Sequence, residues 1–277
     1  MKKFWKKTSL FLVTAAMTVS APLMAWALEH DIVILHTNDI HCGINDNIGF
    51  DGLAQIKRDT LARTPNVALV DAGDAIQGAP IGKLSRGLAV VSIMNYLGYD
   101  FCIPGNHEFD YGMDRFLELA PLQRAGYYCA NLVYTGNNKQ VLPGYKIMQY
   151  EDTKVAFIGA STPESLTTST PTFFQNAKGQ YIYSFCEDKS GNKLYKQLQK
   201  NIDKARKEGA DYVFIVGHLG MDGTTPQWSS ESVAKNTQGV DAVIDGHSHE
   251  RFTRMVKNKV GKDVLLAQTG TKLKTVG

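Results

Sequence analysis

The chain has 277 residues, of which 43% are hydrophobic and 21% charged, and its formal net charge at pH 7 is +3. This composition excludes a disordered or fibrous protein and fits one large globular domain or two small ones. The excess positive charge comes from four lysines in the first seven residues, and the remaining chain has a formal charge of −1, so we expect no nucleic-acid partner.

Residues 1–27 are predicted to form a secretory signal peptide. A basic start is followed by the apolar stretch "SLFLVTAAMTVSAPLMA" and by Ala25-Trp26-Ala27, a small-x-small cleavage site. The alternative is an uncleaved anchor, but several polar residues and Pro22 leave the apolar run short for a span of ~20 residues. We therefore expect a mature protein that starts at Leu28, carries no membrane segment, and is periplasmic, secreted or held at the cell surface.

The first half of the mature chain alternates strand and helix patterns. Apolar runs predict strands at 31–38, 66–74, 99–106 and 127–134, and helical periodicity predicts helices at 52–63, 89–98 and 113–126. Pro121 should kink or stop the last of these helices, because proline removes a backbone donor.

The second half continues the alternation. Strands are predicted at 145–150 and 154–161, joined as a hairpin, and then at 210–218, 240–249 and 263–270. A helix is predicted at 193–209, with an apolar face formed by Leu194, Leu198, Ile202 and Ala205, and a short one at 232–236. Residues 162–187 are rich in Thr, Ser, Pro and Gly and should form a long loop, which is usually functional.

This pattern predicts an α/β protein with a largely parallel central sheet, in which ligands bind beyond the carboxyl ends of the strands. The four cysteines Cys42, Cys102, Cys129 and Cys186 are far apart and include no C-x-x-C pair, which excludes a zinc ribbon and a thioredoxin motif. Three disulfide pairings stay open for an exported protein. Cys102 and Cys129 lie in apolar runs and are expected to be small core residues, paired or unpaired.

Ionisable and amide side chains gather where five of the predicted strands end. Five of the seven histidines lie there, a concentration that is hard to obtain by chance. The residues are Asp39 and His41; Asp71 and Asp74; Asn106, His107 and Asp110; His218; and His247 and His249. We expect them to meet at one edge of the sheet.

The donor types indicate a metal centre. Carboxylate, imidazole and amide oxygen together suit zinc, manganese or iron, and the lack of thiolate argues against a structural cysteine site. There are too many donors for one ion but enough for two ions ~3.5–4 Å apart that share a carboxylate. Such a pair produces a hydroxide from bound water at neutral pH and clamps phosphoryl oxygens, so hydrolysis of a phosphate ester is the expected reaction.

Five sequence blocks carry a resemblance to a known family. In order they are "LHTNDIHCG", "VDAGDAIQG", "GNHEFDYG", "VGHLG" and "DGHSH". They resemble the calcineurin-like metallophosphoesterases, and most of all the catalytic domain of the secreted UDP-sugar hydrolase/5′-nucleotidase family. The resemblance runs from about Ile32 to the end of the chain.

The resemblance implies a layered sandwich in which central β-sheets are flanked by helices, with a dinuclear site at the C-terminal ends of the strands. It implies that Asp39, His41 and His249 hold one ion, that Asn106, His218 and His247 hold the other, and that Asp74 bridges them. It further implies that His107 stabilises the phosphate and helps the leaving oxygen, while Asp110 orients its imidazole. Glu108 is expected to serve structure. The ions would be Zn²⁺ or Mn²⁺, with Fe, Co and Mg as alternatives.

Two features depart from the family pattern. His249 stands where some relatives carry glutamine or asparagine. Because imidazole binds a transition metal at least as well, this difference should adjust the properties of the metal site without removing its ability to bind metal. Family members usually continue into a second, nucleoside-gripping domain, whereas this sequence ends at "GTKLKTVG", so residues 28–277 are expected to form the catalytic domain alone, with weak substrate binding.

The expected substrates are small phosphoesters, namely 5′-nucleotides and nucleotide sugars. One alternative keeps the site but acts on 2′,3′-cyclic nucleotides or another phosphodiester. A second alternative is a non-catalytic metal-binding protein. A metalloprotease is not expected, because the sequence contains no His-Glu-x-x-His. The sequence does not indicate an oligomeric state.

Overall fold

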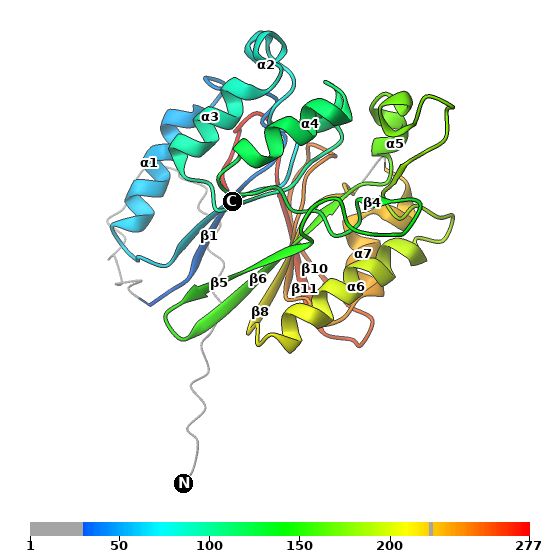
Figure 1. Cartoon of the computed structure of the whole chain (residues 1–277). Coiled ribbons are helices and arrows are strands. Elements are labelled where there is room, and N and C mark those ends of the chain that lie inside the picture. Colours follow the sequence, from blue (N-terminus) through cyan, green and yellow to red (C-terminus); the bar gives the residue numbers. More distant parts are fainter. Residues whose placement is uncertain (1–29, 222–223) are drawn as a thin grey trace.

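Two β-sheets pack face to face between two layers of helices in the computed structural model, which describes residues 30–221 and 224–277 (Figure 1). The predicted signal peptide, residues 1–27, lies outside the described residues. Within the described part of the chain, every helix is too short or too polar to cross a bilayer.

The first sheet is small and entirely parallel. It has the order β1-β2-β3, formed by Val33–Thr37, Val67–Asp71 and Phe101–Cys102. Its outer face is covered by helices from the first half of the chain. These are α1 (Gly49–Leu61), α2 (Pro80–Ser85), α3 (Leu88–Leu97) and α4 (Met113–Leu119).

The second sheet has six strands in the order β10-β11-β9-β8-β6-β5. The inner four are mutually parallel, and the edge strands β5 and β10 run antiparallel to their neighbours. The strands are β5 (Tyr145–Tyr150), β6 (Thr153–Ser161), β8 (Tyr212–His218), β9 (Ala242–Ile244), β10 (Arg251–Lys257) and β11 (Asp263–Thr269). Helices α6 (Asn192–Lys207) and α7 (Ser230–Asn236) cover its outer face.

Short elements complete the fold. Strands β4 (Val133–Tyr134) and β7 (Tyr183–Ser184) form a small antiparallel pair. Helix α5 (Ser165–Thr168) lies in the long loop after β6. Single 3₁₀ turns are η1 (His107–Phe109), η2 (Ala120–Leu122), η3 (Pro171–Phe174) and η4 (Pro226–Trp228).

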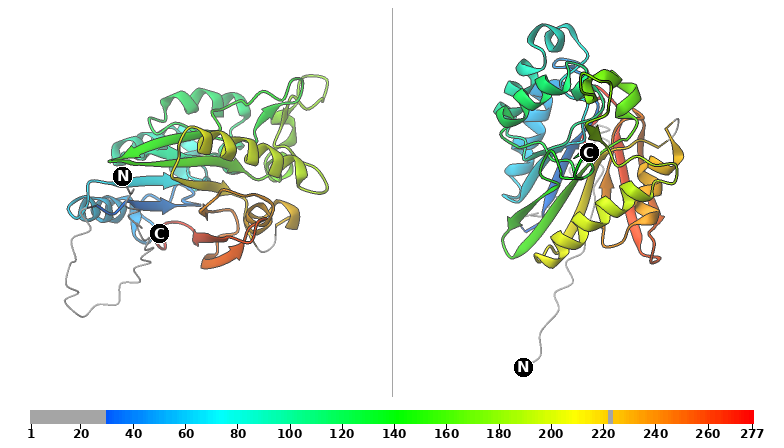
Figure 2. Two further views of the ribbon diagram at one scale, coloured as in Figure 1. Left: turned by 90° about the horizontal axis from the view of Figure 1, so that it is seen from below. Right: turned by 45° about the vertical axis from the view of Figure 1, so that its right-hand side comes forward.

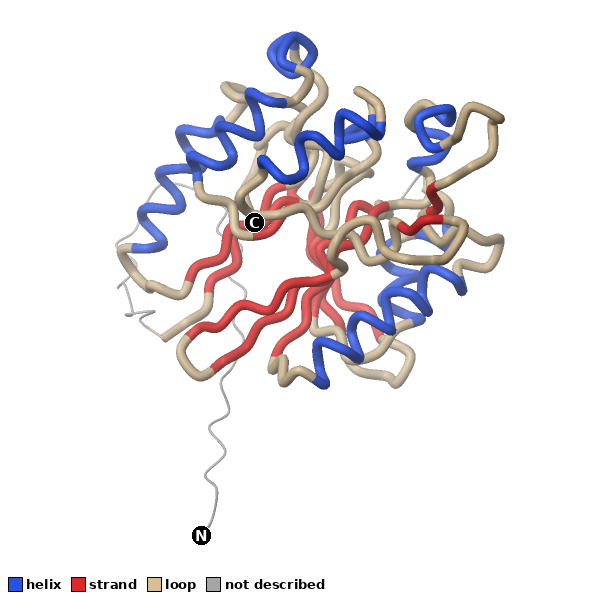
Figure 3. Tube along the Cα trace, in the orientation of Figure 1, coloured by secondary structure: helices blue, strands red, loops and turns tan. Residues whose placement is uncertain are grey.

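The central core lies between the two sheets. Val70 and Phe101 from the first sheet meet Phe157, Val216 and Ile244 from the second, and all are almost fully buried. The rings of Phe101 and Phe157 have centroids 5.6 Å apart, so the two sheets are in direct contact through these aromatic side chains. Figures 2 and 3 show the strands forming the two inner layers, with helices outside.

The predicted α/β class and the layered sandwich are confirmed, but the single sheet inferred from the strand pattern is wrong. The ligand-bearing strands are divided between two sheets, with β1, β2 and β3 in one and β8 and β9 in the other. The carboxyl ends of both sheets meet, because interleaved apolar side chains hold them face to face. The site therefore forms across two sheet edges.

Several element boundaries also differ from the predictions. The strand expected at 127–134 is reduced to Val133–Tyr134, and that at 99–106 to Phe101–Cys102. Helix α2 and strand β10 were not predicted. Pro121 ends α4 in a 3₁₀ turn, as expected, and the predicted apolar face of α6 is buried. Cys102 and Cys129 are buried, and all four cysteines are free thiols.

Candidate metal centre

Strained loops carry the predicted ligands away from the strand ends. Asp39, His41, Asp74, His247 and His249 all have positive φ, between 48° and 80°. Non-glycine residues rarely adopt this conformation, and it persists only where the surroundings enforce it, often at functional sites. Here backbone bonds tie the loops together, because the amide of Asp39 donates to the carbonyl of Gly73 at 2.9 Å and that of His41 to Asp74 at 2.9 Å.

One group of donor residues combines Asp39 and His41, which follow a strand of the first sheet, with His249, which follows a strand of the second. Oδ1 of Asp39 lies 3.3 Å from Nε2 of His249 and 3.9 Å from Nε2 of His41. The Nε2 atoms of the two histidines are 3.1 Å apart. Since Nδ1 of His41 faces the carbonyl of Gln77 at 3.3 Å, Nε2 is its free ligand atom. One ligand atom from each residue could hold an ion.

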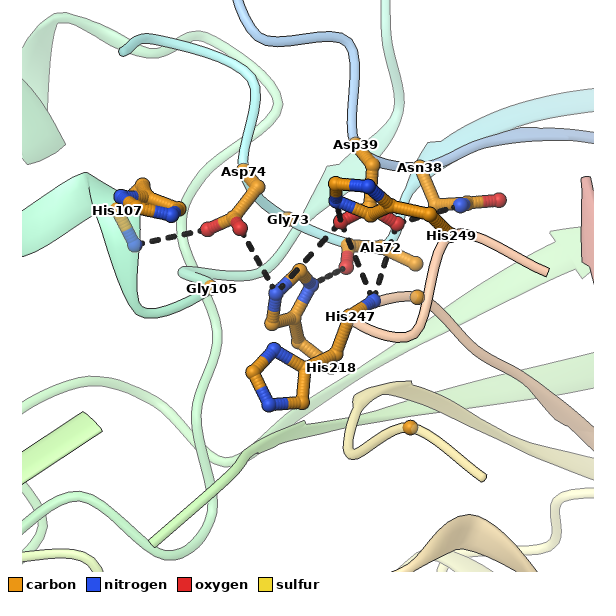
Figure 4. A network of polar contacts seen from close by, with 12 residues as sticks. Asn38, Asp39, Ala72, Gly73, Asp74, Gly105, His107, His218, His247 and His249 are labelled. Atoms are coloured by element: carbon orange, nitrogen blue, oxygen red, sulfur yellow. Dashed lines mark hydrogen bonds and ion pairs between the residues drawn. The ribbon is translucent and has the colours of Figure 1, made fainter. Parts of the chain in front are cut away.

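A second group shares Asp39 and adds Asp74 and His218. Nε2 of His218 lies 3.1 Å from Oδ2 of Asp74 and 3.9 Å from Oδ1 of Asp39 (Figure 4). Its other nitrogen, Nδ1, donates to the carbonyl of Ala72 at 2.7 Å, which leaves the lone pair on Nε2. His218 is completely buried, so this nitrogen is a ligand atom without access to bulk water.

Asp74 belongs to the second group and also approaches the first. Its Oδ1 accepts the backbone N–H of His107 at 2.8 Å, while Oδ2 lies 3.1 Å from Nε2 of His218 and 4.0 Å from Nε2 of His41. One oxygen thus faces an imidazole of each group. Asp39 is the carboxylate common to both groups, and the bridging role of Asp74 stays a prediction.

The donors fit a divalent cation. Oδ1 of Asn106 is buried and lacks a hydrogen-bond partner among the described residues, while Nε2 of His218, also buried, faces the carboxylates of Asp74 and Asp39 at 3.1 and 3.9 Å. Leaving a buried polar atom unsatisfied costs about 1–3 kcal/mol, and a cation bound by Asn106 would remove that cost. Oxygen and nitrogen donors without thiolate match zinc, manganese or iron.

Electrostatics also favour a cation at this point. Burial lowers the pKa of His218, but the carboxylates of Asp74 and Asp39 outweigh burial and raise it to about 10. Burial raises the pKa of Asp74, but His218 and neighbouring histidines outweigh that effect and lower it. Two buried carboxylates therefore draw positive charge into the site, which protons or divalent ions would supply.

His247 is held differently from the other predicted ligands. It belongs to neither donor group of the described residues, and its Nε2 lies 2.9 Å from Oε2 of Glu164. Its backbone N–H donates to the carboxylate of Asp39 at 3.0 Å. The structure thus gathers Asp39, His41, Asp74, His218 and His249, while metal ligation by His247 stays a prediction.

The predicted dyad is formed beside the metal centre. Nδ1 of His107 lies 2.6 Å from Oδ2 of Asp110, and this bond raises the pKa of His107 to about 9 against the opposing effect of burial. The ring of His107 packs edge-on to that of His41, with centroids 5.4 Å apart. A groove of about 660 Å³ opens next to the dyad and is lined by Gln77, Gly78, Lys83, Asp110, Tyr111 and 168–170.

Glu108 serves structure, as expected from the sequence. Its buried carboxylate accepts the backbone N–H groups of Asp74, Ala75, Ile76 and Gly105 at 2.6–3.2 Å. The loops after β2 and β3 are thereby joined at the point where they present Asp74 and Asn106. Glycine is needed at 105, because a Cβ there would lie 2.2 Å from Oδ1 of Asp74.

Two residues that contact the site were missed by the sequence analysis. Glu164 bonds His247, and Oγ of Ser169 donates to Oδ1 of Asp110 at 3.1 Å. Both lie in the loop 162–187, whose length alone indicated a function. No periodicity or motif distinguishes these two among the many polar residues of the loop.

Comparisons with known proteins agree with this geometry. The family model described as calcineurin-like phosphoesterase matches residues 32–251. A snake venom 5′-nucleotidase from Gloydius brevicauda is 30% identical over 259 residues, which cover 87% of this chain and 40% of that protein. The chain thus spans less than half the length of this relative.

Solved structures share the fold. A 5′-nucleotidase precursor from Thermus thermophilus superposes with a TM-score of 0.73 at 25% identity, covering 88% of this chain and 49% of that one. The calcineurin-like phosphoesterase YfkN from Bacillus subtilis gives a TM-score of 0.70 at 25% identity, covering 88% and 82%.

Proposed function

The chain belongs to the calcineurin-like phosphoesterase family, and from this premise we propose that it is a metal-dependent hydrolase of nucleotide phosphate esters, of the 5′-nucleotidase or UDP-sugar hydrolase type. The observation that carries the proposal is the convergence of carboxylate and imidazole donors from two sheets, with a buried, unpartnered Oδ1 of Asn106, beside the His107–Asp110 pair. Relatives named 5′-nucleotidase support the substrate class.

The proposed site holds two divalent ions, Zn²⁺ or Mn²⁺ in the first place and Fe, Co or Mg as alternatives. Asp39, His41 and His249 would hold one ion, and Asn106, His218 and His247 the other. Asp74 would lie between them. When bound, such ions acidify water and polarise phosphoryl oxygens.

His107 is proposed to act directly on the ester. Because Asp110 occupies Nδ1, the nitrogen available to a substrate oxygen is Nε2, and the raised pKa keeps its proton at neutral pH. His107 would donate a hydrogen bond to the phosphoryl group and then pass the proton to the leaving oxygen. The organic part of the ester would lie in the groove beside Asp110, where Lys83 offers a positive charge to an anionic substrate.

The relatives favour neither alternative raised by the sequence. Cyclic nucleotide phosphodiesters would use the same donors, and a non-catalytic metal-binding protein would have no use for the dyad. Export to the periplasm or cell exterior, with residues 1–27 as the signal, completes the proposal; a venom relative supports secretion.

The test is a substrate panel with and without chelator. Purified protein is analysed for bound metal and then assayed on 5′-nucleotides, nucleotide sugars, 2′,3′-cyclic nucleotides and simple phosphomonoesters. Chelator-sensitive release of phosphate from 5′-nucleotides or cleavage of nucleotide sugars is expected. A metal-loaded protein that is inert towards the whole panel would overturn the proposal, and turnover of cyclic nucleotides alone would replace it with a phosphodiesterase function.

A further inference from the structure

The ring of His247 is gripped by a carboxylate that comes from the long loop after β6. Oε2 of Glu164 lies 2.9 Å from Nε2 of His247. Both side chains are largely buried, with 16% and 13% of their surface exposed, so water competes little for this contact. The contact thus joins Glu164, which follows β6, to His247, a predicted ligand that follows β9.

Glu164 is itself fixed by a third loop. Its other oxygen, Oε1, accepts the backbone N–H of Thr225 at 2.6 Å and the hydroxyl of Thr225 at 2.5 Å. One oxygen of Glu164 thus accepts from Thr225, and the other is left to face the ring of His247.

The contact determines which nitrogen of His247 is free. A glutamate carboxylate that already accepts two hydrogen bonds from Thr225 also acts as the acceptor towards His247, so Nε2 is the N–H donor of that ring and Nδ1 keeps the lone pair. The backbone amide of His247 is anchored on Asp39, and its ring centroid lies 5.0 Å from that of His218. The ring is thus held next to a donor group of the metal centre.

We infer that Glu164 is a positioning residue of the metal centre: it fixes the orientation and tautomer of His247 so that Nδ1 is presented as a ligand. The inference rests on the proposed function, because it needs a metal at this site. His41 and His218 are oriented in the same manner by the carbonyls of Gln77 and Ala72. A carboxylate partner is stronger than a carbonyl and also raises the basicity of the ligand imidazole.

A purely structural role is separable from this one. The backbone carbonyl of Glu164 accepts the N–H groups of Thr167 and Thr168 and so supports helix α5, but a side-chain substitution leaves these bonds in place. Only the carboxylate connects to His247. A substitution at 164 therefore tests the positioning role without removing the local backbone structure.

The experiment compares Glu164→Gln with Glu187→Gln. Glutamine has one acceptor oxygen, so either Thr225 or His247 loses its partner. Glu187 is a matched control: it lies in the same loop and accepts bonds from Ser184 and the amide of Phe185, without contacting a histidine. Metal-free protein is titrated with Zn²⁺ against a chromophoric chelator. Glu164→Gln is expected to weaken the binding of one of the two Zn²⁺ ions 10–100-fold and to leave the affinity for the other unchanged. Glu187→Gln should change neither affinity.

A double-mutant cycle separates positioning from folding. In a His247→Ala background, Glu164→Gln should have no further effect on Zn²⁺ affinity, because the residue it positions is gone. Equal effects with and without His247, or unchanged affinity in the single variant, would overturn the inference. Should Glu164→Gln fail to fold, Thr225→Val is titrated instead. A smaller loss of affinity for the same Zn²⁺ ion is expected, and unchanged affinity would count against the inference.

The proposed function can fail separately. If the unsubstituted protein binds two ions that respond to Glu164 as expected but hydrolyses no phosphoester, the positioning role stands and the enzymatic proposal falls. If the protein turns over nucleotides and its Zn²⁺ affinities are the same with and without Glu164→Gln, the enzymatic proposal stands and the positioning role falls. A protein that binds no divalent ion would contradict both.

Discussion

The hydroxyl of Ser169 donates to Oδ1 of Asp110 at 3.1 Å, whereas His107 contacts the other oxygen of that carboxylate. Asp110 is therefore held at both oxygens while it orients the imidazole. Ser169 belongs to the same loop as Glu164, so one segment supports both the dyad and His247. The loop after β6 thus braces two parts of the candidate site that come from different sheets.

Replacing His107 by Ala should lower kcat by ~10²–10⁴, the usual range for an acid–base group, and leave the metal content unchanged. The reason is that the side chain of His107 contributes no predicted metal ligand, while its raised pKa supplies the proton for the leaving oxygen. Steady-state kinetics and elemental analysis of the same preparation check this. Loss of metal together with rate would show that the division of roles is wrong.

Ser169→Ala should have a weaker effect of the same kind. One hydrogen bond to a carboxylate is lost, worth about 1.5 kcal/mol, so kcat should fall about tenfold if Asp110 turns away from His107. Ser165→Ala is the matched control, because its hydroxyl donates at 2.8 Å to the carbonyl of Thr162 in the same loop and does not contact the dyad. Similar losses in both variants would indicate a general loosening of the loop.

Asp74→Ala should remove bound metal as well as activity. Oδ2 of Asp74 lies within 4.0 Å of a histidine from each donor group, so its loss affects both proposed ions. Elemental analysis after gel filtration is expected to find less than one ion per chain. Retention of both ions would mean that Asp39, the carboxylate common to the two groups, is the bridge instead.

Glu108→Gln should destabilise the metal-free protein by about 3 kcal/mol, because four backbone N–H groups share its buried carboxylate and an amide would place N–H against N–H. Urea unfolding in the presence of chelator measures this. Glu187→Gln should cost clearly less, because both bonds of Glu187 are accepted by one oxygen, which the amide oxygen of glutamine can replace, at a less buried position. Equal midpoints for the two variants would contradict the role assigned to Glu108.

The metal-type residues could be placed from the sequence because short apolar strands end in carboxylates and imidazoles, and parallel strands bring such ends together. Asp39 and His218 were found in this way. Their arrangement across two sheets was not, because the packing of Phe101 against Phe157 depends on tertiary contacts that carry no local pattern. Glu164 lay in a polar loop, where a glutamate has no distinguishing neighbours in sequence.

Element boundaries failed for similar physical reasons. Strand β10, Arg251–Lys257, is an edge strand with mostly exposed, polar side chains, so it shows little apolar alternation. Most of residues 127–134 are buried, but only Val133–Tyr134 form a strand. A buried segment with only isolated backbone bonds to its neighbours, such as those of Tyr128 to Cys102 and of Ala130 to Gly159, has the same composition as a strand, and sequence pattern does not separate the two.

His36 should make the protein less stable below neutral pH. It is buried in β1, and this burial lowers its pKa to about 4. The unfolded chain takes up a proton below the ordinary pKa of about 6.5, whereas the folded protein does so only below about 4. The unfolded state therefore binds more protons between these values, and stability present above pH 6.5 is lost as the pH falls to 4, by about 3 kcal/mol at most.

Chelator-treated protein and its His36→Leu variant, unfolded in urea at a series of pH values from 7 to 4, test this expectation. Because leucine does not titrate, the stability difference between the two proteins should shift in favour of His36→Leu as the pH falls, while the metal-site histidines contribute equally to both. Parallel curves for the parent and His36→Leu would mean that the folded protein accommodates a protonated His36.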